Sequence, residues 1–254
     1  MAALKERIRW LLAGSPLERP AKAVWNMVNR HTPSRYDQQT EEIIRTHSQS
    51  HWNCADVGAN VGDISDLLLR YCPTGTHYLF EPIPANADLL RRKYRRSANV
   101  TIFDDALSDR AGTTTFHYNI AHPATSGIKE QRYFTKNNKI QLIEVKTARM
   151  DDKLLTAQVD LIKIDVEGAE LLVLRGAKET IVRCKPLVVF EHSPYSAPYY
   201  GYGAEEMFGY FDDVGYGIYL LDDFLANRPP LARERFVKDS KEAREWYFVA
   251  KPIQ

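Results

Sequence analysis

The sequence predicts a doubly wound α/β fold, in which a mostly parallel β-sheet carries helices on both of its faces. Short apolar segments of strand length alternate with longer segments at helical spacing, a pattern typical of βαβ units. The apolar segments are nearly continuous, as expected for strands that are buried on both faces. Acidic residues or glycines directly follow several of these segments, at the edge where open α/β sheets bind their ligands.

Strands are expected where short apolar runs end at turn-forming residues, and helices where apolar residues recur every three or four positions. In chain order, the expected strands are 52–57, 77–80, 100–103, 113–120, 140–147, 159–164 and 187–190. The expected helices are 61–71, 86–96 and 169–182.

Length and composition indicate one folded domain with an N-terminal extension. The chain has 254 residues, which is near the upper limit for a single hydrophobic core. Residues 1–50 are expected to form a helical extension and residues 51–254 the α/β domain. A tyrosine-rich segment at 193–235 is expected to bind an acceptor substrate or to form a lid. The 34 Lys and Arg residues balance 33 Asp and Glu residues, which argues against a main role in coating nucleic acid or anionic membrane.

Cysteine usage and the N-terminus predict a cytoplasmic protein. Three cysteines without a C-x-x-C spacing form neither a disulfide framework nor a zinc site, so reduced thiols are expected. Glu6, Arg7 and Arg9 interrupt any apolar core of a signal peptide, and no apolar run is long enough to span a bilayer. Residues 1–14 are instead expected to form an amphipathic helix packed on the body, with contact to a membrane surface as the alternative.

The loop 56–62 reads Asp-Val-Gly-Ala-Asn-Val-Gly between an expected strand and an expected helix. Gly58 and Gly62 would let the backbone turn tightly and approach a bound nucleoside, next to free amides at the helix N-terminus. Asn60 stands where a nicotinamide-binding fingerprint requires its second glycine. The loop therefore favours a nucleoside ligand without a diphosphate. A plain strand-to-helix turn is the alternative.

Acidic residues at the ends of the next two strands strengthen the nucleoside interpretation. Glu81 follows Gly58 by 23 positions, close to the offset of about 20 residues at which an acid binds ribose hydroxyls. Asp105 and Ala106 follow the strand 100–103, where a side-chain acceptor and a backbone N–H could bind an adenine edge. Each acid is an ordinary turn residue when it occurs alone.

Two more acids follow the strand 159–164. Asp165 and Glu167 are expected beside the same cleft, where a carboxylate can orient an ammonium group or shape a reaction site. Helix capping is the alternative for these acids. No metal is expected, because His117 and His122 have no recognisable ligand spacing to other residues. The basic run 91–96 is interpreted as a solvated helix end.

Several segments resemble, in the same order, the FkbM family of S-adenosylmethionine-dependent methyltransferases. They are DVGANVGDIS, FEPIPANADLL, DDALSDRAGTTTF, the Thr-Ser-Gly loop at 125–127, DLIKIDVEGAELLVLRGA and VVFEHS, over residues 52–193. The resemblance implies a seven-stranded, Rossmann-like class I methyltransferase sheet and methyl transfer, most often to a hydroxyl oxygen of a sugar or natural product. By position it implies a cofactor site around Asp56, Gly58, Asn60, Gly62, Glu81, Asp105 and Asp165.

The predicted function is that of an S-adenosylmethionine-dependent O-methyltransferase acting on a hydroxyl of a sugar, glycolipid or related natural product in the cytoplasm. The alternatives are an N-methyltransferase on RNA or protein, a nicotinamide-dependent oxidoreductase and a non-catalytic nucleoside-binding module. The expected partner is a small-molecule or glycan acceptor, with no nucleic acid and no stable membrane insertion.

His192 is expected to be the general base of this reaction. It follows the strand 187–190 at the sheet edge, and histidine accepts protons readily near neutral pH. Glu191 is expected to alternate away from the site, and Asp165 is the competing base. A structural histidine that closes the turn is the alternative for His192.

Tyrosines are concentrated in the segment after this strand. Tyr195 and Tyr199 are expected to bind the acceptor, because an aromatic ring can stack on a sugar face while its hydroxyl donates a hydrogen bond. A lid or a subunit contact in a homodimer is the alternative.

Overall fold

The structure is a computed structural model and describes residues 34–130 and 137–253. The amphipathic helix expected at 1–14 and most of the expected N-terminal extension lie outside the described residues. The described part of that extension contains the helix α3 (Arg35–His47). Its N-terminus is closed by a capping box, in which Ser34 Oγ accepts from the Asp37 amide and the Asp37 carboxylate accepts from the Ser34 amide.

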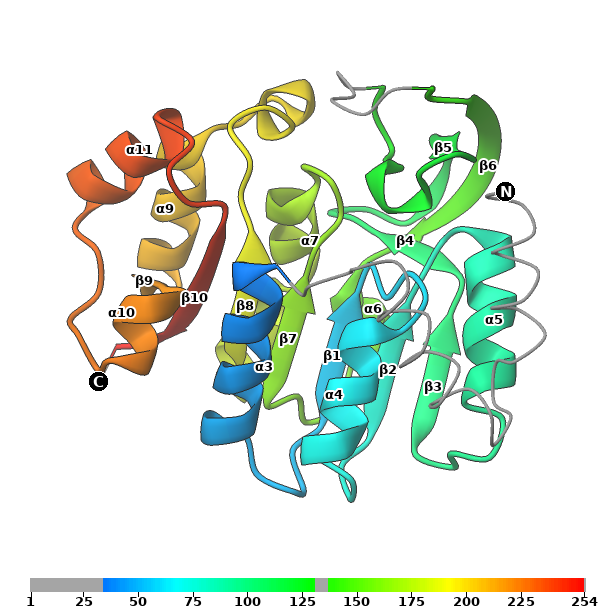
Figure 1. The fold of residues 1–254 in the computed structure, drawn as a ribbon, viewed down its shortest axis with the longest axis horizontal. Helices are drawn as coiled ribbons and strands as arrows, with labels where there is room; N and C mark the ends of the chain where they lie inside the picture. The colour runs from blue at the N-terminus through cyan, green and yellow to red at the C-terminus, as the bar shows by residue number, and fades with distance from the viewer. Residues whose placement is uncertain (1–33, 131–136, 254) are drawn as a thin grey trace.

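A seven-stranded sheet forms the centre of the fold (Figure 1). The pairs that β1 makes with β2 and β7, and the pairs β2–β3 and β7–β8, are parallel, whereas β10 is antiparallel to both β8 and β9. The mostly parallel seven-stranded sheet expected from the sequence is thereby confirmed. In spatial order the strands are β3 (Val100–Phe103), β2 (His77–Phe80), β1 (Cys54–Val57), β7 (Leu161–Ile164), β8 (Leu187–Glu191), β10 (Tyr247–Pro252) and β9 (Tyr216–Leu220).

Helices cover both faces of this sheet, as the doubly wound prediction requires. Alternate residues of each strand point to opposite faces, so Cys54 packs with helix residues Ile43 and Leu68 on one face. Ala55 belongs to the larger core on the other face. The first face carries α3, α4 (Asp63–Tyr71), α5 (Pro84–Lys93) and α10 (Leu221–Leu225). The second carries α6 (Met150–Lys153), α7 (Glu170–Gly176), α8 (Lys178–Cys184), α9 (Ala204–Asp213) and α11 (Arg233–Lys241).

The segment expected as one helix over 169–182 is two short helices, α7 and α8. The helical conformation is interrupted at Ala177, between α7 and α8. A Cβ on Gly176 would lie 2.0 Å from the carbonyl oxygen of Ser108, so the end of α7 is packed directly against backbone. Asp151 then caps α8 by accepting from the Thr180 amide at 2.8 Å.

A second, three-stranded sheet lies beyond the carboxyl ends of β1 and β2 (Figure 1). Its strands are β4 (Asp105–Leu107), β6 (Ile140–Ala148) and β5 (Gly112–Asn119), in that spatial order. Two short 3₁₀ helices, η1 (Pro123–Thr125) and η2 (Ala197–Tyr200), complete the described elements. None of the helices in the two described ranges meets the length and hydropathy of a bilayer-spanning segment.

Candidate active site

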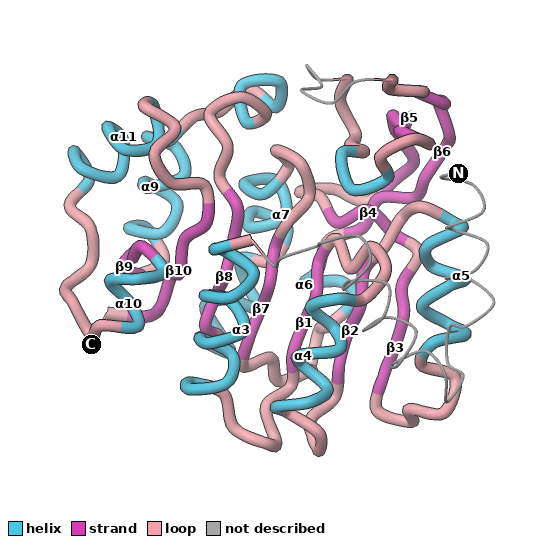
Figure 2. The backbone as a smooth tube through the Cα atoms, in the orientation of Figure 1, coloured by secondary structure: helices cyan, strands magenta, loops and turns pink. Residues whose placement is uncertain are grey.

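A cavity of about 340 Å³ lies where β1, β2, β7 and β8 end. The loops that follow these strands gather at one edge of the sheet (Figure 2). The second sheet and its connecting loop close the opposite side with Phe116, Ser126 and Ile128. Eight residues expected from the sequence to bind cofactor or acceptor are among the lining residues: Asp56, Gly58, Asn60, Glu81, Asp105, Ala106, Asp165 and Glu167.

The loop after β1 has a left-handed backbone at Gly58 (φ 80°), Asn60 (φ 49°) and Gly62 (φ 81°). A Cβ on Gly58 would lie 2.0 Å from the carbonyl oxygen of Asp165, so this position requires glycine for both its conformation and its packing. Gly62 does not line the cavity, and it caps the N-terminus of α4. The loop is therefore shaped by its contact with the turn after β7.

Lys93 holds the other end of this loop. Its Nζ donates to the carbonyl oxygens of Val61 and Gly62, at 3.0 and 2.9 Å, and to Asp66 Oδ2 at 2.8 Å. Lys93 belongs to the basic run 91–96, whose interpretation from the sequence was a solvated helix end. For this residue that interpretation is wrong, because its side chain is only 7% exposed.

Glu81 lies directly after β2 and is 3% exposed. Its Oε2 accepts from the Asn60 amide at 2.7 Å and its Oε1 from the Ile83 amide at 2.9 Å. Burial raises the pKa of this carboxyl group to about 7. A carboxylate has about four acceptor positions, so two fixed amide donors leave it able to accept from two adjacent hydroxyls of a ligand.

Asp56 and Asp105 lie on either side of Glu81 along the cavity edge. Asp56 is the penultimate residue of β1 and is nearly buried. It accepts from Ser65 Oγ in α4 at 2.5 Å, and burial raises its pKa. Asp105 begins β4 and pairs with Lys153 at 2.6 Å. Ala106 follows it in the cavity wall. These neighbours place two acids and a strand edge beside the glycine-containing loop.

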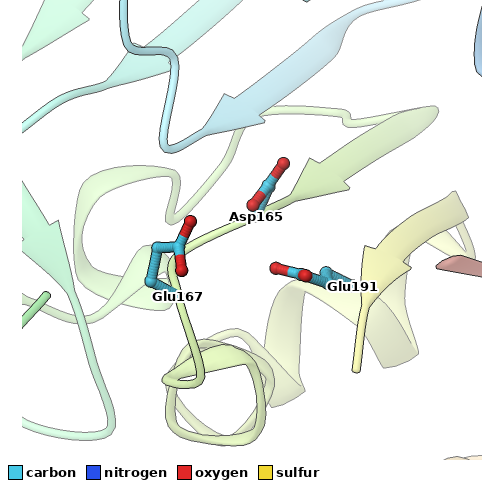
Figure 3. Close-up of side chains that lie close together, drawn as sticks. All are labelled: Asp165, Glu167 and Glu191. Carbon is cyan, nitrogen blue, oxygen red and sulfur yellow. The ribbon is translucent and has the colours of Figure 1, made fainter. Parts of the chain in front are cut away.

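Three carboxylates meet at the other end of the cavity (Figure 3). Oxygens of Asp165, Glu167 and Glu191 all lie within 4.8 Å of one another. Glu167 has a left-handed backbone (φ 57°), which is uncommon outside glycine. A cluster of this composition could hold a hard cation such as Mg²⁺. This cluster was not expected from the sequence, because Glu191 was predicted to face away from Asp165 and Glu167.

Asp165 is held by two donors. Lys163 Nζ lies 3.0 Å from Asp165 Oδ2, and Tyr247 Oη donates to the same oxygen at 2.6 Å. Burial by itself would raise the pKa of Asp165, but Lys163 and these hydrogen bonds outweigh it and keep the pKa below its usual value. Asp165 is therefore an ionised partner of a buried lysine.

Glu191 is the last residue of β8 and lines the cavity, so its predicted orientation is wrong. It is 9% exposed. Burial, followed by the negative charges of Asp165 and Glu167, raises its pKa well above the usual value for glutamate.

His192 is turned away from the cavity, contrary to expectation. Its side chain is 0% exposed and packs near Tyr202 and Phe236, with ring centroids 5.9 and 5.8 Å away. Both ring nitrogens lack a hydrogen-bond partner among the described residues. Burial lowers its pKa to about 4. The side chains of Glu191 and His192 face opposite sides of the sheet, as expected, but Glu191 lies in the cavity and His192 in the core.

Tyr195 and Tyr199 also lie outside the cavity lining, at 49% and 46% exposure. Tyr195 packs edge-on against Trp246, with ring centroids 5.8 Å apart. Other tyrosines of this segment support the backbone: Tyr210 donates to the Leu174 carbonyl and Tyr216 to the Pro186 carbonyl. Much of the local concentration of tyrosine thus reflects packing between α9, β9 and the neighbouring turns.

Cavity residues that were not expected from the sequence include Lys163, Glu191 and Tyr247. Lys163 had a signal, because it is the one cation in an apolar strand and precedes Asp165 by two positions, on the same face. Tyr247 had none. It reaches Asp165 only because β10 pairs antiparallel with β8 and places Tyr247 opposite Glu191.

Comparison with known proteins identifies related sequences and folds. The model of the methyltransferase FkbM domain matches residues 56–218. The chain is 29% identical to the 2-O-methyltransferase NoeI of Sinorhizobium fredii over 154 residues, which are 56% of this chain and 62% of that protein. It is 30% identical to the methyltransferase sdnD of Sordaria araneosa over 154 residues, 49% of this chain and 60% of that protein.

Both matches therefore span less than two thirds of the relatives' length. Among solved structures, a methyltransferase FkbM from Methylobacillus flagellatus superposes with a TM-score of 0.50 at 14% identity, over 95% of this chain and 60% of that one. At this identity the superposition supports the fold.

Proposed function

The chain belongs to the FkbM methyltransferase family, and from that premise we propose that it transfers a methyl group from S-adenosylmethionine to a hydroxyl oxygen. The relative NoeI is named as a 2-O-methyltransferase, which supports oxygen as the receiving atom. Neither of the two relatives reported above is named for methyl transfer to nitrogen or for hydride transfer.

The observation that carries this proposal is the environment of Glu81. Its carboxylate is buried beside the loop of Gly58 and Asn60 and is fixed by two backbone amides, at 2.7 and 2.9 Å. A rigid carboxylate at the end of the second strand is suited to bind the two hydroxyls of a ribose. The left-handed loop next to it permits close approach of the backbone to a nucleoside. The residues present therefore fit the cofactor.

Three cavity residues are assigned to the cofactor. Glu81 would bind its ribose, and Asp105 and Ala106 would bind its base. The cofactor supplies an electrophilic methyl group on a sulfonium. The protein's task is then to align the acceptor oxygen with that methyl group and to accept the hydroxyl proton.

The acceptor is proposed to be a small molecule or glycan that carries a hydroxyl. The wall formed by Phe116, Ile128 and Ser126 offers apolar surface with a polar rim, as expected of a site for a sugar or natural product. All three cysteines are free thiols, which supports a cytoplasmic location.

Calorimetry on the purified protein tests the cofactor. We expect S-adenosylmethionine and S-adenosylhomocysteine to bind and NAD not to bind. Glu81→Gln should weaken binding, whereas Glu179→Gln, a change at an exposed residue on α8, should not. Binding of NAD alone would refute the proposal. Incubation with methyl-labelled cofactor and a panel of methyl glycosides, followed by mass spectrometry, then tests transfer to oxygen.

A further inference from the structure

We propose that Glu191 is the catalytic base of this methyl transfer. The inference rests on the proposed function, because it concerns the proton that a hydroxyl loses when it is methylated. The candidates for accepting that proton lie at or just after the ends of β7 and β8: Asp165, Glu167, Glu191 and His192.

His192 fails on position. Its ring is fully buried, does not line the cavity, and lies near the aromatic rings of Tyr202 and Phe236. A general base must come within hydrogen-bonding distance of the proton that it accepts. His192 could do so only if β8 were turned over, and β8 is paired on both sides.

Asp165 fails on its existing partners. Its Oδ2 already accepts from Lys163 and Tyr247, at 3.0 and 2.6 Å. A carboxylate stabilised by a buried ammonium group and a phenol is a weak base, because accepting another proton would disrupt the ion pair. These contacts instead fix the Asp165 carboxylate next to that of Glu191.

Glu191 has the position in the cavity that His192 lacks, and it is not held by an ion pair as Asp165 is. It ends a central strand, so its position is set by sheet pairing with Tyr247 on β10 and by the adjoining β7. Its side chain lines the cavity and is 9% exposed. The strand and the two neighbouring strands therefore hold the carboxyl group in a fixed place, largely shielded from solvent.

The charges around Glu191 make it a stronger base than an ordinary glutamate. Asp165 and Glu167 face it within the cluster, Glu170 adds a third negative charge from α7, and Lys163 on β7 is the opposing cation. Burial and these three carboxylates outweigh Lys163 and raise its pKa well above the usual value. A carboxylate with a raised pKa binds a proton more strongly than an ordinary glutamate does.

Glu167 is the remaining rival. It lies in the turn between β7 and α7, with the left-handed backbone noted above, and it is more exposed than Glu191. A turn is a less rigid support than the end of a central strand, and a precise donor–acceptor geometry favours the rigid position. Glu167 is therefore assigned to acceptor binding.

The proposed step balances. The acceptor oxygen forms a bond to the methyl carbon while the bond from that carbon to sulfur breaks. The electron pair of the broken bond remains on sulfur, which becomes a neutral thioether. The hydroxyl proton moves to Glu191 and is later released to solvent. Only ionised Glu191 can act, so kcat/KM should rise with pH through the pKa of this group.

The test compares Glu191→Gln with Glu167→Gln and Glu179→Gln. Binding of S-adenosylmethionine is measured by calorimetry, and turnover is measured from pH 5 to 9 with a methyl glycoside that the wild type methylates. Glu191→Gln should bind the cofactor within about threefold of wild type, lose about 10²- to 10⁴-fold in kcat and lose the acidic limb of the pH profile. Glu167→Gln should keep that limb. Glu179→Gln should match the wild type.

A second variant covers failure of Glu191→Gln to fold. Glu191→Asp keeps the carboxylate but shortens its reach, so kcat should fall by about tenfold or more with the acidic limb retained. Three results would each overturn the assignment: Glu191→Gln that keeps more than a tenth of wild-type kcat, a folded Glu191→Gln that no longer binds cofactor, and Glu191→Asp with unchanged kcat. Cofactor binding and glycoside methylation by the wild type are measured before any variant. If the wild type does not bind the cofactor, or methylates none of the glycosides, the proposed function is refuted instead.

Discussion

The buried ring of His192 should make the free energy of unfolding depend on pH. Burial lowers its pKa from 6.5 to about 4. Between these values the unfolded chain binds a proton that the folded chain does not, so the contribution of His192 to stability is complete above pH 6.5 and is lost as pH falls. At pH 5 the loss amounts to about 2 kcal/mol for this gap in pKa. That is a large share of the stability of a typical domain.

Buried carboxyl groups, Glu81 and Glu170 among them, act in the opposite direction and would hide this effect in the wild type alone. Burial raises the pKa of both Glu81 and Glu170 to about 7. Their contribution to stability is complete below their unfolded pKa and is lost as pH rises towards 7. The measurement must therefore compare two proteins that differ only at position 192.

His192→Phe is the suitable change, because the ring lies among the aromatic side chains of Tyr202 and Phe236. Urea unfolding at pH 7.5 and pH 5.0 gives the free energy of unfolding of each protein. Between the two pH values the wild type should lose about 2 kcal/mol more than the variant. His192→Leu serves if the phenylalanine ring is too large for the site. An equal loss in wild type and variant would refute the assignment of His192 as a buried neutral residue.

Three further changes test the cavity. Glu81→Gln should weaken binding of S-adenosylmethionine about ten- to hundredfold, through loss of a charged acceptor. Wild-type affinity should also rise from pH 6 to 8, since the pKa of Glu81 is about 7. Calorimetry that shows neither effect would remove Glu81 from the site. Gly58→Ala should destabilise the fold by about 2 kcal/mol or more in thermal melts, because its Cβ would meet the Asp165 carbonyl at 2.0 Å; Gly209→Ala, in α9 with no atom within 4 Å, is the matched control and should not destabilise. Turnover should survive EDTA, because Lys163 already pairs with Asp165 at 3.0 Å; a loss that Mg²⁺ restores would show instead that the three carboxylates hold a metal.

The sequence was informative wherever one local pattern decides the outcome. The strands at 77–80 and 100–103 have the predicted bounds, because a short apolar run between turn residues has few other ways to be buried. The left-handed Gly58 and the cavity position of Glu81 also follow from local spacing along a βαβ unit. The break at Ala177 depends on how closely Gly176 approaches Ser108, a contact between distant segments that no local pattern contains.

The sequence by itself determined that neighbouring residues of β8 face opposite sides of the sheet, because side chains alternate along a strand. Only the tertiary structure decided which side holds the cavity. Pairing of β1 with β7 places Asp56 beside Lys163, and pairing of β7 with β8 places Lys163 beside Val189, two residues before Glu191. Asp56, Lys163 and Glu191 therefore share the cavity face, and His192 turns into the core. Register between strands is set by long-range packing and hydrogen bonding, so the sequence could show that Glu191 and His192 face opposite sides, but its choice of His192 as the base, with Asp165 as the competitor, placed the wrong side in the cavity.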